Sequence, residues 1–309
     1  MLYIGEDDVP HAAATVEAGL NVAFVTNNAS RRPEVVAEQL SGQGIPARPE
    51  EVVTSGQAAA RLVAAQVPAG SAVLVLGTDA LVHELTQAGL RAVRTVAEAG
   101  EDGVAAVVQG LSPDTCHRDL AEATVALRAG ALWVAGNTDA TLPNRRGPMP
   151  GNGAFVAALR LVTGLEPLVA GKPDPALHAE SVLRVGAARP LVIGDRLDTD
   201  VLGAVRGDAD SLLVLTGVAD QAALLKAPPG SRPTFVSSDL RGLLQPHPEV
   251  VLDGDRAHCG EVTVRYENGA VQVEKPGDGD AEGAPDVATL RASAALAWAC
   301  ADAEQSPPA

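Results

Sequence analysis

The sequence is poor in cysteine and in aromatic residues, and each scarcity excludes a class of protein. Its 309 residues include three Cys, two Trp, two Tyr and three Phe. Three cysteines far apart in the chain make neither a disulfide framework nor a spacing typical of zinc sites, so we expect a reducing, cytoplasmic compartment. The few aromatic side chains argue against the stacking platforms with which proteins bind single-stranded nucleic acid.

Positive charge and long hydrophobic runs are also scarce. The chain carries 23 basic against 39 acidic side chains, a formal net charge of −16. A surface of this sign repels phosphate backbones and anionic lipids, so we expect no nucleic-acid partner and no membrane partner. The apolar runs fall far short of the ~20 residues that a bilayer span needs. With 46% hydrophobic residues, the chain can still bury a sizeable core.

Short β-branched runs alternate with amphipathic helical segments over the first 220 residues, which predicts an α/β fold with a largely parallel sheet. Beyond residue 248 the pattern changes. Alternating valines flank Asn268-Gly269 and predict a hairpin, and 286–304 reads as an alanine-rich helix. We therefore expect a small α+β appendage at 249–309. The main expected strands are 21–25, 52–54, 72–76, 105–108, 131–135, 168–170, 190–193 and 211–215.

Three polar loops directly follow expected strands. The first contains Thr26-Asn27-Asn28, the second contains Lys172, and the third contains Asp195 with two further aspartates. Ligands of parallel sheets bind at the carboxyl ends of the strands. A hydroxyl, a lysine and a carboxylate cluster could together hold a phosphoryl group bridged to Mg²⁺. Each loop alone has an ordinary structural reading, as a turn, a helix cap or a solvated charge.

The combination resembles the haloacid dehalogenase (HAD) superfamily, specifically its subfamily IIA of NagD-like, p-nitrophenyl- and glycerol-3-phosphate phosphatases. Residues 1–220 carry the likeness. The matching segments are F-V-T-N-N-A-S at 24–30, A-G-K-P-D-P at 170–175 and I-G-D-R-L-D-T-D at 193–200. The cap insert is matched by V-A-G-N-T-D at 134–139, L-P at 142–143 and P-G-N-G at 150–153.

The resemblance implies a HAD-like Rossmannoid core with an inserted cap. The core would be discontinuous, at 1–68 and 166–248, with an α/β cap of the C2 type at 69–165 and the appendage at 249–309. Cap-mediated homodimers are common in this subfamily, so the likeness also implies a homodimer.

The likeness assigns roles on the phosphate side of the site. Thr26 would donate a hydrogen bond to the transferring phosphoryl group, and Asn27 and Asn28 would complete its loop as further phosphate-binding residues. Lys172 would neutralise the phosphoryl group and the nucleophile.

Metal and cap roles follow in the same way. Asp195 would bind Mg²⁺ directly and Asp200 would support the metal from behind, while Asp198 is expected to be solvated. Leu142 and Pro143 of the cap would lie near a small organic phosphate. The Leu-Pro pair is closer to glycerol-3-phosphate and phosphoglycolate enzymes than to pyridoxal-phosphate enzymes, and glycerol 3-phosphate is the favoured substrate.

The nucleophile of the family is missing from the sequence. In that family it lies in a D-x-D-G-[TV] motif at the end of the first strand, and no such motif stands here. The segment from Leu2 to Ala12 resembles what normally follows the motif. We therefore expect the chain to lack its first core strand at the N-terminus, and the chain alone to be inactive without those aspartates.

Three functions remain open from the sequence. The favoured one is a Mg²⁺-dependent phosphatase. The alternative is a non-catalytic relative that binds phosphate or Mg²⁺ or serves as a dimerising module, which the missing aspartates support. A nucleotide-binding Rossmann protein is least favoured, because no well-placed G-x-G-x-x-G occurs. Two further expectations concern tryptophans: Trp133 should lie in a core, and Trp298 should dock the last helix.

Overall fold

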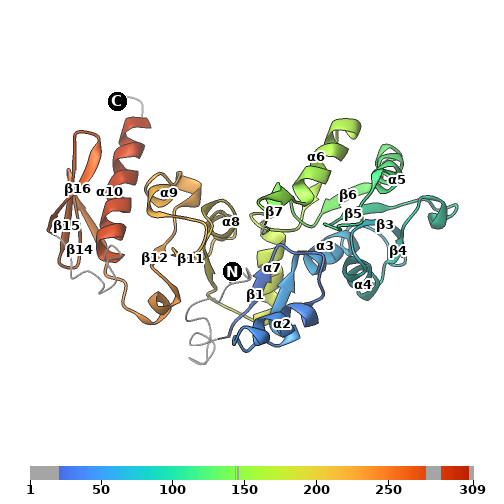
Figure 1. The fold of residues 1–309 in the computed structure, drawn as a ribbon, viewed down its shortest axis with the longest axis horizontal. Coiled ribbons are helices and arrows are strands. Elements are labelled where there is room, and N and C mark those ends of the chain that lie inside the picture. Colours follow the sequence, from blue (N-terminus) through green and yellow to red (C-terminus); the bar gives the residue numbers. More distant parts are fainter. Residues whose placement is uncertain (1–20, 143, 145, 276–286, 306–309) are drawn as a thin grey trace. The chain divides into compact units, whose positions relative to one another are not determined.

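The computed structural model describes residues 21–142, 144, 146–275 and 287–305. The chain divides into two compact units, one formed by Asn21–Ala188 and another whose described part begins at Arg189. Each unit contains its own parallel sheet with helices packed against it (Figure 1). The predicted α/β fold class is therefore confirmed.

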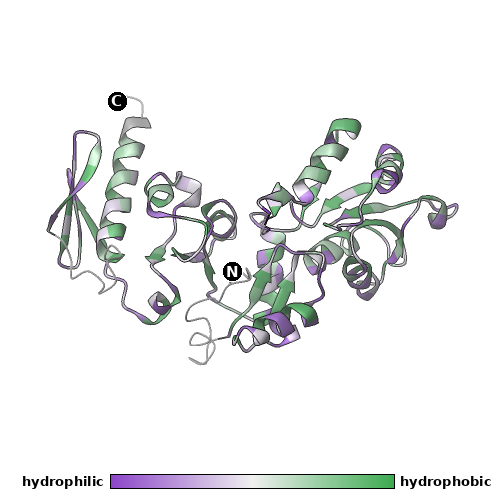
Figure 2. Ribbon diagram, in the orientation of Figure 1, coloured by the Kyte–Doolittle hydropathy of each residue, from purple (hydrophilic) through white to green (hydrophobic). Residues whose placement is uncertain are grey.

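A five-stranded parallel sheet forms the centre of the first unit. Its inner strands consist almost wholly of Val, Leu and Ala and are hydrophobic up to Gln109 at the end of β5 (Figure 2). Such unbroken apolar strands are typical of parallel sheets buried on both faces. In spatial order, the strands are β4 (Arg91–Val93), β3 (Ala72–Leu76), β5 (Ala106–Gln109), β6 (Leu132–Ala135) and β9 (Leu168–Val169).

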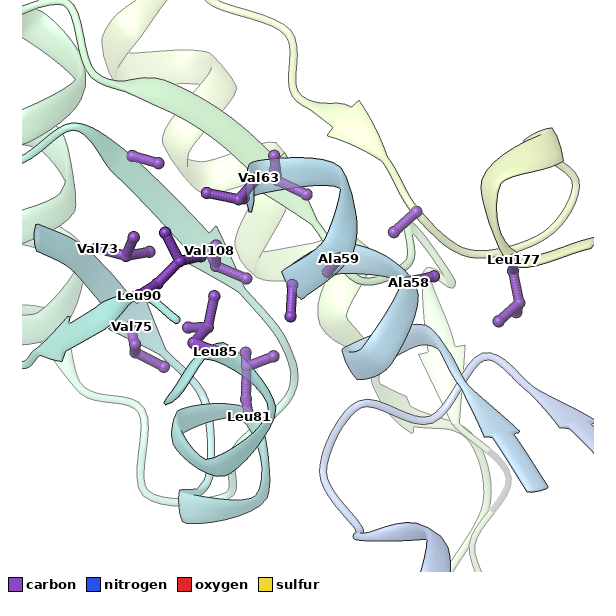
Figure 3. Packing of buried hydrophobic residues seen from close by; sticks show 14 of the residues in the cluster. Ala58, Ala59, Val63, Val73, Val75, Leu81, Leu85, Leu90, Val108 and Leu177 are labelled. Atoms are coloured by element: carbon purple, nitrogen blue, oxygen red, sulfur yellow. The ribbon is translucent and has the colours of Figure 1, made fainter. Parts of the chain in front are cut away.

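Helices cover both faces of this sheet. Val73 and Val75 face the side covered by α3 and α4, where Leu81 and Leu85 pack on them (Figure 3). Neighbouring residues of the same strands face α5 and α6, and Trp133 is buried there as predicted. The alternation of side chains along a strand thus serves two cores. These helices are α3 (Ser55–Ala64), α4 (Asp79–Gln87), α5 (His117–Arg128) and α6 (Asn152–Thr163).

A smaller parallel pair in the same unit consists of β1 (Phe24–Thr26) and β2 (Val52–Thr54). Between them runs α2 (Pro33–Gly42), whose first residue is a proline, as favoured at a helix start. Thr54 ends β2 and also caps α3, since its side chain accepts a hydrogen bond from Gln57 N at 3.2 Å. The unit ends with α7 (Pro175–Val185).

The segment 137–153, which is rich in Pro and Gly, contains a two-stranded antiparallel hairpin. Its strands are β7 (Thr141–Leu142) and β8 (Met149–Pro150). An alternating pattern cannot be recognised here, because each strand is only two residues long.

The second unit begins with a three-stranded parallel sheet. A five-residue π-helix (Leu197–Val201) follows its first strand and leads into α8 (Leu202–Arg206). The strands are β10 (Leu191–Gly194), β11 (Asp210–Val214) and β12 (Phe235–Ser237), with α9 (Gln221–Leu225) before β12. Short 3-10 turns in the two units span Pro49–Glu51, Ala97–Ala99, Pro229–Ser231 and Leu240–Leu244.

The expected C-terminal hairpin is present, but it belongs to a four-stranded antiparallel sheet. Two further strands precede it and turn at Gly254, which has a φ of 59°. The strands are β13 (Val250–Asp253), β14 (Arg256–Cys259), β15 (Val262–Glu267) and β16 (Ala270–Lys275).

Helix α10 (Val287–Gln305) has two apolar faces. Ala292 and Leu296 pack on the four-stranded sheet, while Leu290 and Ala294 pack on the core around β11 and β12. Figure 1 shows the helix between these two parts of its unit. Trp298 docks it as predicted, because its ring N–H donates to the carbonyl of Leu224 at 2.9 Å.

The predicted core at 1–68 and 166–248 and the predicted cap at 69–165 stay a prediction. The structure adds that β9, from the expected second core segment, pairs with β6 of the expected cap. Within the described ranges, no helix is both long and apolar enough to cross a bilayer.

Candidate active site

The Thr26–Ser30 segment forms a tight turn at the end of β1. The backbone N–H of Asn28 donates to Thr26 Oγ1 at 3.2 Å, and both the N–H and the hydroxyl of Ser30 donate to Asn28 Oδ1 at 2.7 Å. The oxygen of Thr26 therefore acts as an acceptor inside the turn. Its hydroxyl hydrogen is the group that can be offered to an external oxygen.

This turn lies against the carboxyl ends of strands in the five-stranded sheet. The hydroxyl of Thr78, just after β3, donates to the carbonyl of Ser30 at 2.9 Å. A Cβ added to Gly110 or Gly136, which follow β5 and β6, would lie 3.1 or 3.0 Å from the Ala29 Cβ. The missing side chains at these glycines let the turn approach the sheet, in the position where parallel sheets bind ligands.

The structure brings Lys172 against this turn, although β1 and β9, which precede the two loops, belong to different sheets. Lys172 is 5% exposed, and its backbone N–H donates to Asn27 Oδ1 at 2.7 Å. The amide nitrogen of Asn27 donates in return to the carbonyl of Lys172 at 3.1 Å. A buried lysine beside a hydroxyl-bearing turn places a positive charge where an anionic ligand could bind.

Four further polar residues support the turn, and the sequence analysis did not assign them to the site. Asp139 Oδ1 and Oδ2 each lie 3.4 Å from Asn27 Nδ2. Ser55 and Asn137 donate to the carbonyl of Asn27 at 2.6 and 2.7 Å, and Asn152 donates to the carbonyl of Asn137 at 2.7 Å. Two of them could have been found from the sequence, because Ser55 and Asn137 are polar residues that follow the apolar strands β2 and β6.

Of the two cap residues predicted to lie near the substrate, only Leu142 is among the described residues. It lies on β7 of the hairpin and is 37% exposed. Pro143 lies outside the described residues.

Asp195 follows β10 in the second unit and is 3% exposed. Its Oδ2 accepts from the N–H of Val218 at 2.8 Å, and its backbone carbonyl accepts from Ala219 at 2.9 Å. Oδ1 is also buried, and no hydrogen bond reaches it from the residues that the structure describes. A buried carboxylate oxygen without a hydrogen-bond donor suits a cation ligand, since an uncompensated buried charge is strongly unfavourable.

Asp200 supports the same loop from inside. It is 1% exposed, and its Oδ2 accepts from the backbone N–H of Arg196 at 3.2 Å. It packs so closely on Gly194 that a side chain at that glycine would collide with its carboxylate. Such a contact fixes the loop that carries Asp195.

Asp198 is solvated, with its side chain 66% exposed, and forms two hydrogen bonds with Arg196 at 3.0 and 2.7 Å. The hydrogen bond from Arg196 holds the pKa of the Asp198 carboxyl below its usual value. Over the described part of the chain, no three His, Cys, Asp or Glu side chains cluster as a metal site. Asp195 is therefore a candidate metal ligand that stands apart from any such cluster among the described residues.

Two family models match the chain. Residues 1–91 match a model described as haloacid dehalogenase-like hydrolase, and residues 169–243 match one described as HAD-hydrolase-like. The first matched segment extends into the predicted cap and the second lies after it, and together they contain all of the predicted phosphate and metal residues except those of the cap.

Known proteins of this family are similar over most of the chain. A D-glycerol 3-phosphate phosphatase of Mycobacterium tuberculosis is 47% identical over 92% of this chain and 79% of its own length. An acid sugar phosphatase of Staphylococcus aureus is 34% identical over 71% of this chain and 84% of its own.

Solved structures agree. The crystal structure of a glycerol phosphate phosphatase from Mycobacterium tuberculosis in complex with magnesium has a TM-score of 0.84 and 43% identity, covering 97% of this chain and 88% of its own. A thermostable NPPase from Geobacillus stearothermophilus gives 0.66 and 32%, covering 74% of this chain and 90% of its own. The chain therefore belongs to the haloacid dehalogenase superfamily and is a subfamily IIA phosphatase by its relatives.

Proposed function

We propose that this chain carries the phosphate- and metal-binding loops of a Mg²⁺-dependent phosphomonoester hydrolase whose substrate is glycerol 3-phosphate. The observation that carries the proposal is the buried Lys172 held against the Thr26 turn. The choice of substrate is supported by the 47% identical glycerol 3-phosphate phosphatase. Phosphoglycolate and p-nitrophenyl phosphate are further substrates of the same chemical class.

On the phosphate side, Thr26 donates its hydroxyl hydrogen to a phosphoryl oxygen, and Lys172 supplies a positive charge that persists through transfer. Both groups come from loops at the end of parallel strands, so they are held by the sheet before substrate binds. Such preorganised donors favour the transition state, in which negative charge spreads over the phosphoryl oxygens.

On the metal side, Asp195 uses its orphaned Oδ1 as a Mg²⁺ ligand and Asp200 holds the loop in place. Magnesium, when bound, offsets negative charge on the phosphoryl oxygens. Mg²⁺ prefers oxygen ligands, so water and phosphoryl oxygens could complete its coordination beside Asp195.

Transfer also needs a carboxylate nucleophile, which the family resemblance assigns to the first aspartate of the D-x-D-G motif that this sequence does not contain. That carboxylate forms a bond to phosphorus as the ester oxygen leaves, and the leaving oxygen takes a proton from the second aspartate of the motif. Water then hydrolyses the aspartyl-phosphate and releases phosphate.

An assay of phosphate release tests this function. The chain as printed and a chain extended by the in-frame upstream sequence are compared on glycerol 3-phosphate, phosphoglycolate and p-nitrophenyl phosphate, with MgCl₂ or with EDTA. We expect hydrolysis by the extended chain in MgCl₂ only, with glycerol 3-phosphate preferred. Absence of hydrolysis by both chains in MgCl₂ would support the non-catalytic alternative instead, which the missing D-x-D-G motif favours.

The proposal includes a homodimer formed through the predicted cap. Its support is a group of exposed apolar residues at the C-terminal end of α6, where Leu161 is 86% exposed and Val162 and Leu165 are also exposed. Large exposed apolar side chains that lie close together are typical of protein–protein contacts.

A further inference from the structure

The side chain of Asn27 is almost completely used by the backbone of one other residue. It is 8% exposed, its Oδ1 accepts from Lys172 N at 2.7 Å, and its Nδ2 donates to Lys172 O at 3.1 Å. An asparagine amide that bonds both the N–H and the C=O of one residue imitates a neighbouring β-strand. The peptide groups on either side of Lys172 are thereby fixed in two directions.

The second hydrogen of the Asn27 amide has an acceptor of its own. Nδ2 lies 3.4 Å from each carboxylate oxygen of Asp139. With one hydrogen directed to the carbonyl of Lys172 and the other toward a carboxylate, the amide has no further donor for a phosphate oxygen. A nearby carboxylate would also repel a phosphate that approached Nδ2.

The backbone of Asn27 is itself held by buried groups. Its carbonyl accepts from Ser55 Oγ at 2.6 Å and from Asn137 Nδ2 at 2.7 Å. Ser55, Asn137 and Asn152, which bonds Asn137 in turn, are all buried. The side chain of Asn27 is therefore a rigid support for whatever it binds.

The neighbour of Lys172 is packed onto the same amide. A Cβ at Gly171 would lie 2.7 Å from Asn27 Oδ1 and 2.5 Å from the carbonyl oxygen of Gly136. Only glycine leaves room for this approach. The segment that carries Lys172 thus touches Asn27 at two successive residues.

We propose that Asn27 is a positioning residue that clamps the backbone of Lys172, and so sets where the lysine ammonium group stands, rather than a ligand of the phosphate. This role rests on the proposed function and differs from the one that the family resemblance implies for Asn27. The lysine side chain is long and flexible, so a fixed backbone removes part of the freedom that phosphate binding would otherwise have to restrict.

The scarcity of lysine allows a direct test. The sequence contains only Lys172, Lys226 and Lys275, so protein labelled with ¹⁵N-lysine gives three backbone amide signals. Lys226→Arg and Lys275→Arg variants assign them. In the unmodified chain we expect the Lys172 amide to exchange its hydrogen slowly. In Asn27→Ala we expect exchange at least about tenfold faster, because the acceptor Oδ1 is gone.

Binding of inorganic phosphate, followed at the same signal, tests the consequence. We expect Asn27→Ala to weaken phosphate binding about tenfold. Asn21→Ala is the matched control, because this asparagine is exposed in the same segment and has no part in the site. It should leave both the exchange rate and the affinity unchanged.

Asn27→Asp is the second variant, in case Asn27→Ala does not fold. It keeps an acceptor for Lys172 N, loses the donor to Lys172 O, and sets a second carboxylate beside Asp139. We expect a protected Lys172 amide together with weakened phosphate binding. The Lys226 amide signal and the melting temperature report whether each variant is folded.

One result would overturn the clamp: a Lys172 amide whose exchange does not change in folded Asn27→Ala. Weaker phosphate binding in that case would make Asn27 a direct ligand. A chain that binds no phosphate but shows the expected loss of amide protection would overturn the proposed function and support the clamp.

Discussion

The two carboxylate oxygens of Asp195 differ in their hydrogen bonds. One carboxylate oxygen accepts a backbone N–H, while the other is buried without a hydrogen bond from the described residues. In the absence of a cation, such an oxygen costs about 1–3 kcal/mol of folding stability or more. This cost supports the proposal that Asp195 binds Mg²⁺, because a bound cation would offset it.

Replacing Asp195 by Asn separates these two effects. The variant keeps an acceptor for Val218 N but loses the charge, so we expect Mg²⁺ affinity to fall at least about tenfold, measured by calorimetric titration with MgCl₂. Without Mg²⁺, the variant should be more stable than the unmodified chain, because a buried charge has been removed.

Asp198→Asn is the control, because the side chain of Asp198 is exposed and its carboxylate bonds Arg196. Its Mg²⁺ affinity should stay the same. An Asp195→Asn variant with undiminished Mg²⁺ affinity would contradict the assignment of Asp195 as a ligand.

His178 provides a prediction about pH. Burial on α7 lowers the pKa of its imidazole. The folded chain therefore favours the neutral ring more than the unfolded chain does, and this contribution to stability is complete above the unfolded pKa of about 6.5. It is lost as the pH falls through the lower folded value.

We expect the melting temperature to drop between pH 7.5 and pH 5, and a His178→Gln variant to lose part of this drop. Equal pH dependence in the two proteins would show that His178 contributes nothing. The burial of His178 could not be predicted from the sequence, because a histidine on an exposed helix face and a half-buried one have the same local pattern.

At the residue scale, the sequence predicted which loops belong together but not how they bond. The strand–loop pattern indicated that Thr26 and Lys172 would share one sheet edge. The bonds of Asn27 to the backbone of Lys172 join residues 145 positions apart and depend on packing at Gly171. Contacts of that kind leave no periodic signal in the sequence.

At the element scale, helices and buried strands were the easiest to predict. Strands 52–54 and 72–76 have the bounds expected from their apolar runs. The pair β13–β14 was missed, since three of the four residues of β13 are exposed and its pattern does not alternate. The Asp253-Gly254-Asp255 segment is its turn, and an Asp-Gly pair is a known hairpin signal.

The docking of α10 can be tested through Trp298. Its ring donates to Leu224 O at 2.9 Å and lies 5.4 Å from the guanidinium of Arg232. We expect Trp298→Ala to lower the free energy of unfolding by about 3 kcal/mol, through lost packing and the lost hydrogen bond. Chemical denaturation followed by circular dichroism measures this change.

Trp298→Phe is the matched variant, because it keeps most of the ring and removes the N–H donor. Its loss should be about 1 kcal/mol. If both variants unfold like the unmodified chain, the helix is held by its other contacts alone.

At the scale of the whole molecule, the predicted cap dimer depends on apolar residues at the end of α6. We expect Leu161→Glu to turn a dimer into a monomer, since it sets a charge where Leu161 is 86% exposed in the single chain. Light scattering coupled to gel filtration measures the mass. Val125→Glu, at an exposed position on the neighbouring helix α5, shows whether the effect is local to α6. A chain that is monomeric before any substitution would contradict the dimer.

The two apolar faces of α10 make that helix a shared structural support. Leu290 and Ala294 serve the core beside β11 and β12, while Ala292 and Leu296 serve the four-stranded sheet. Neither neighbour can lose the helix without exposing its own apolar surface to water. The C-terminal sheet and the core beside β12 should therefore open together in hydrogen exchange, as a single cooperative folding unit.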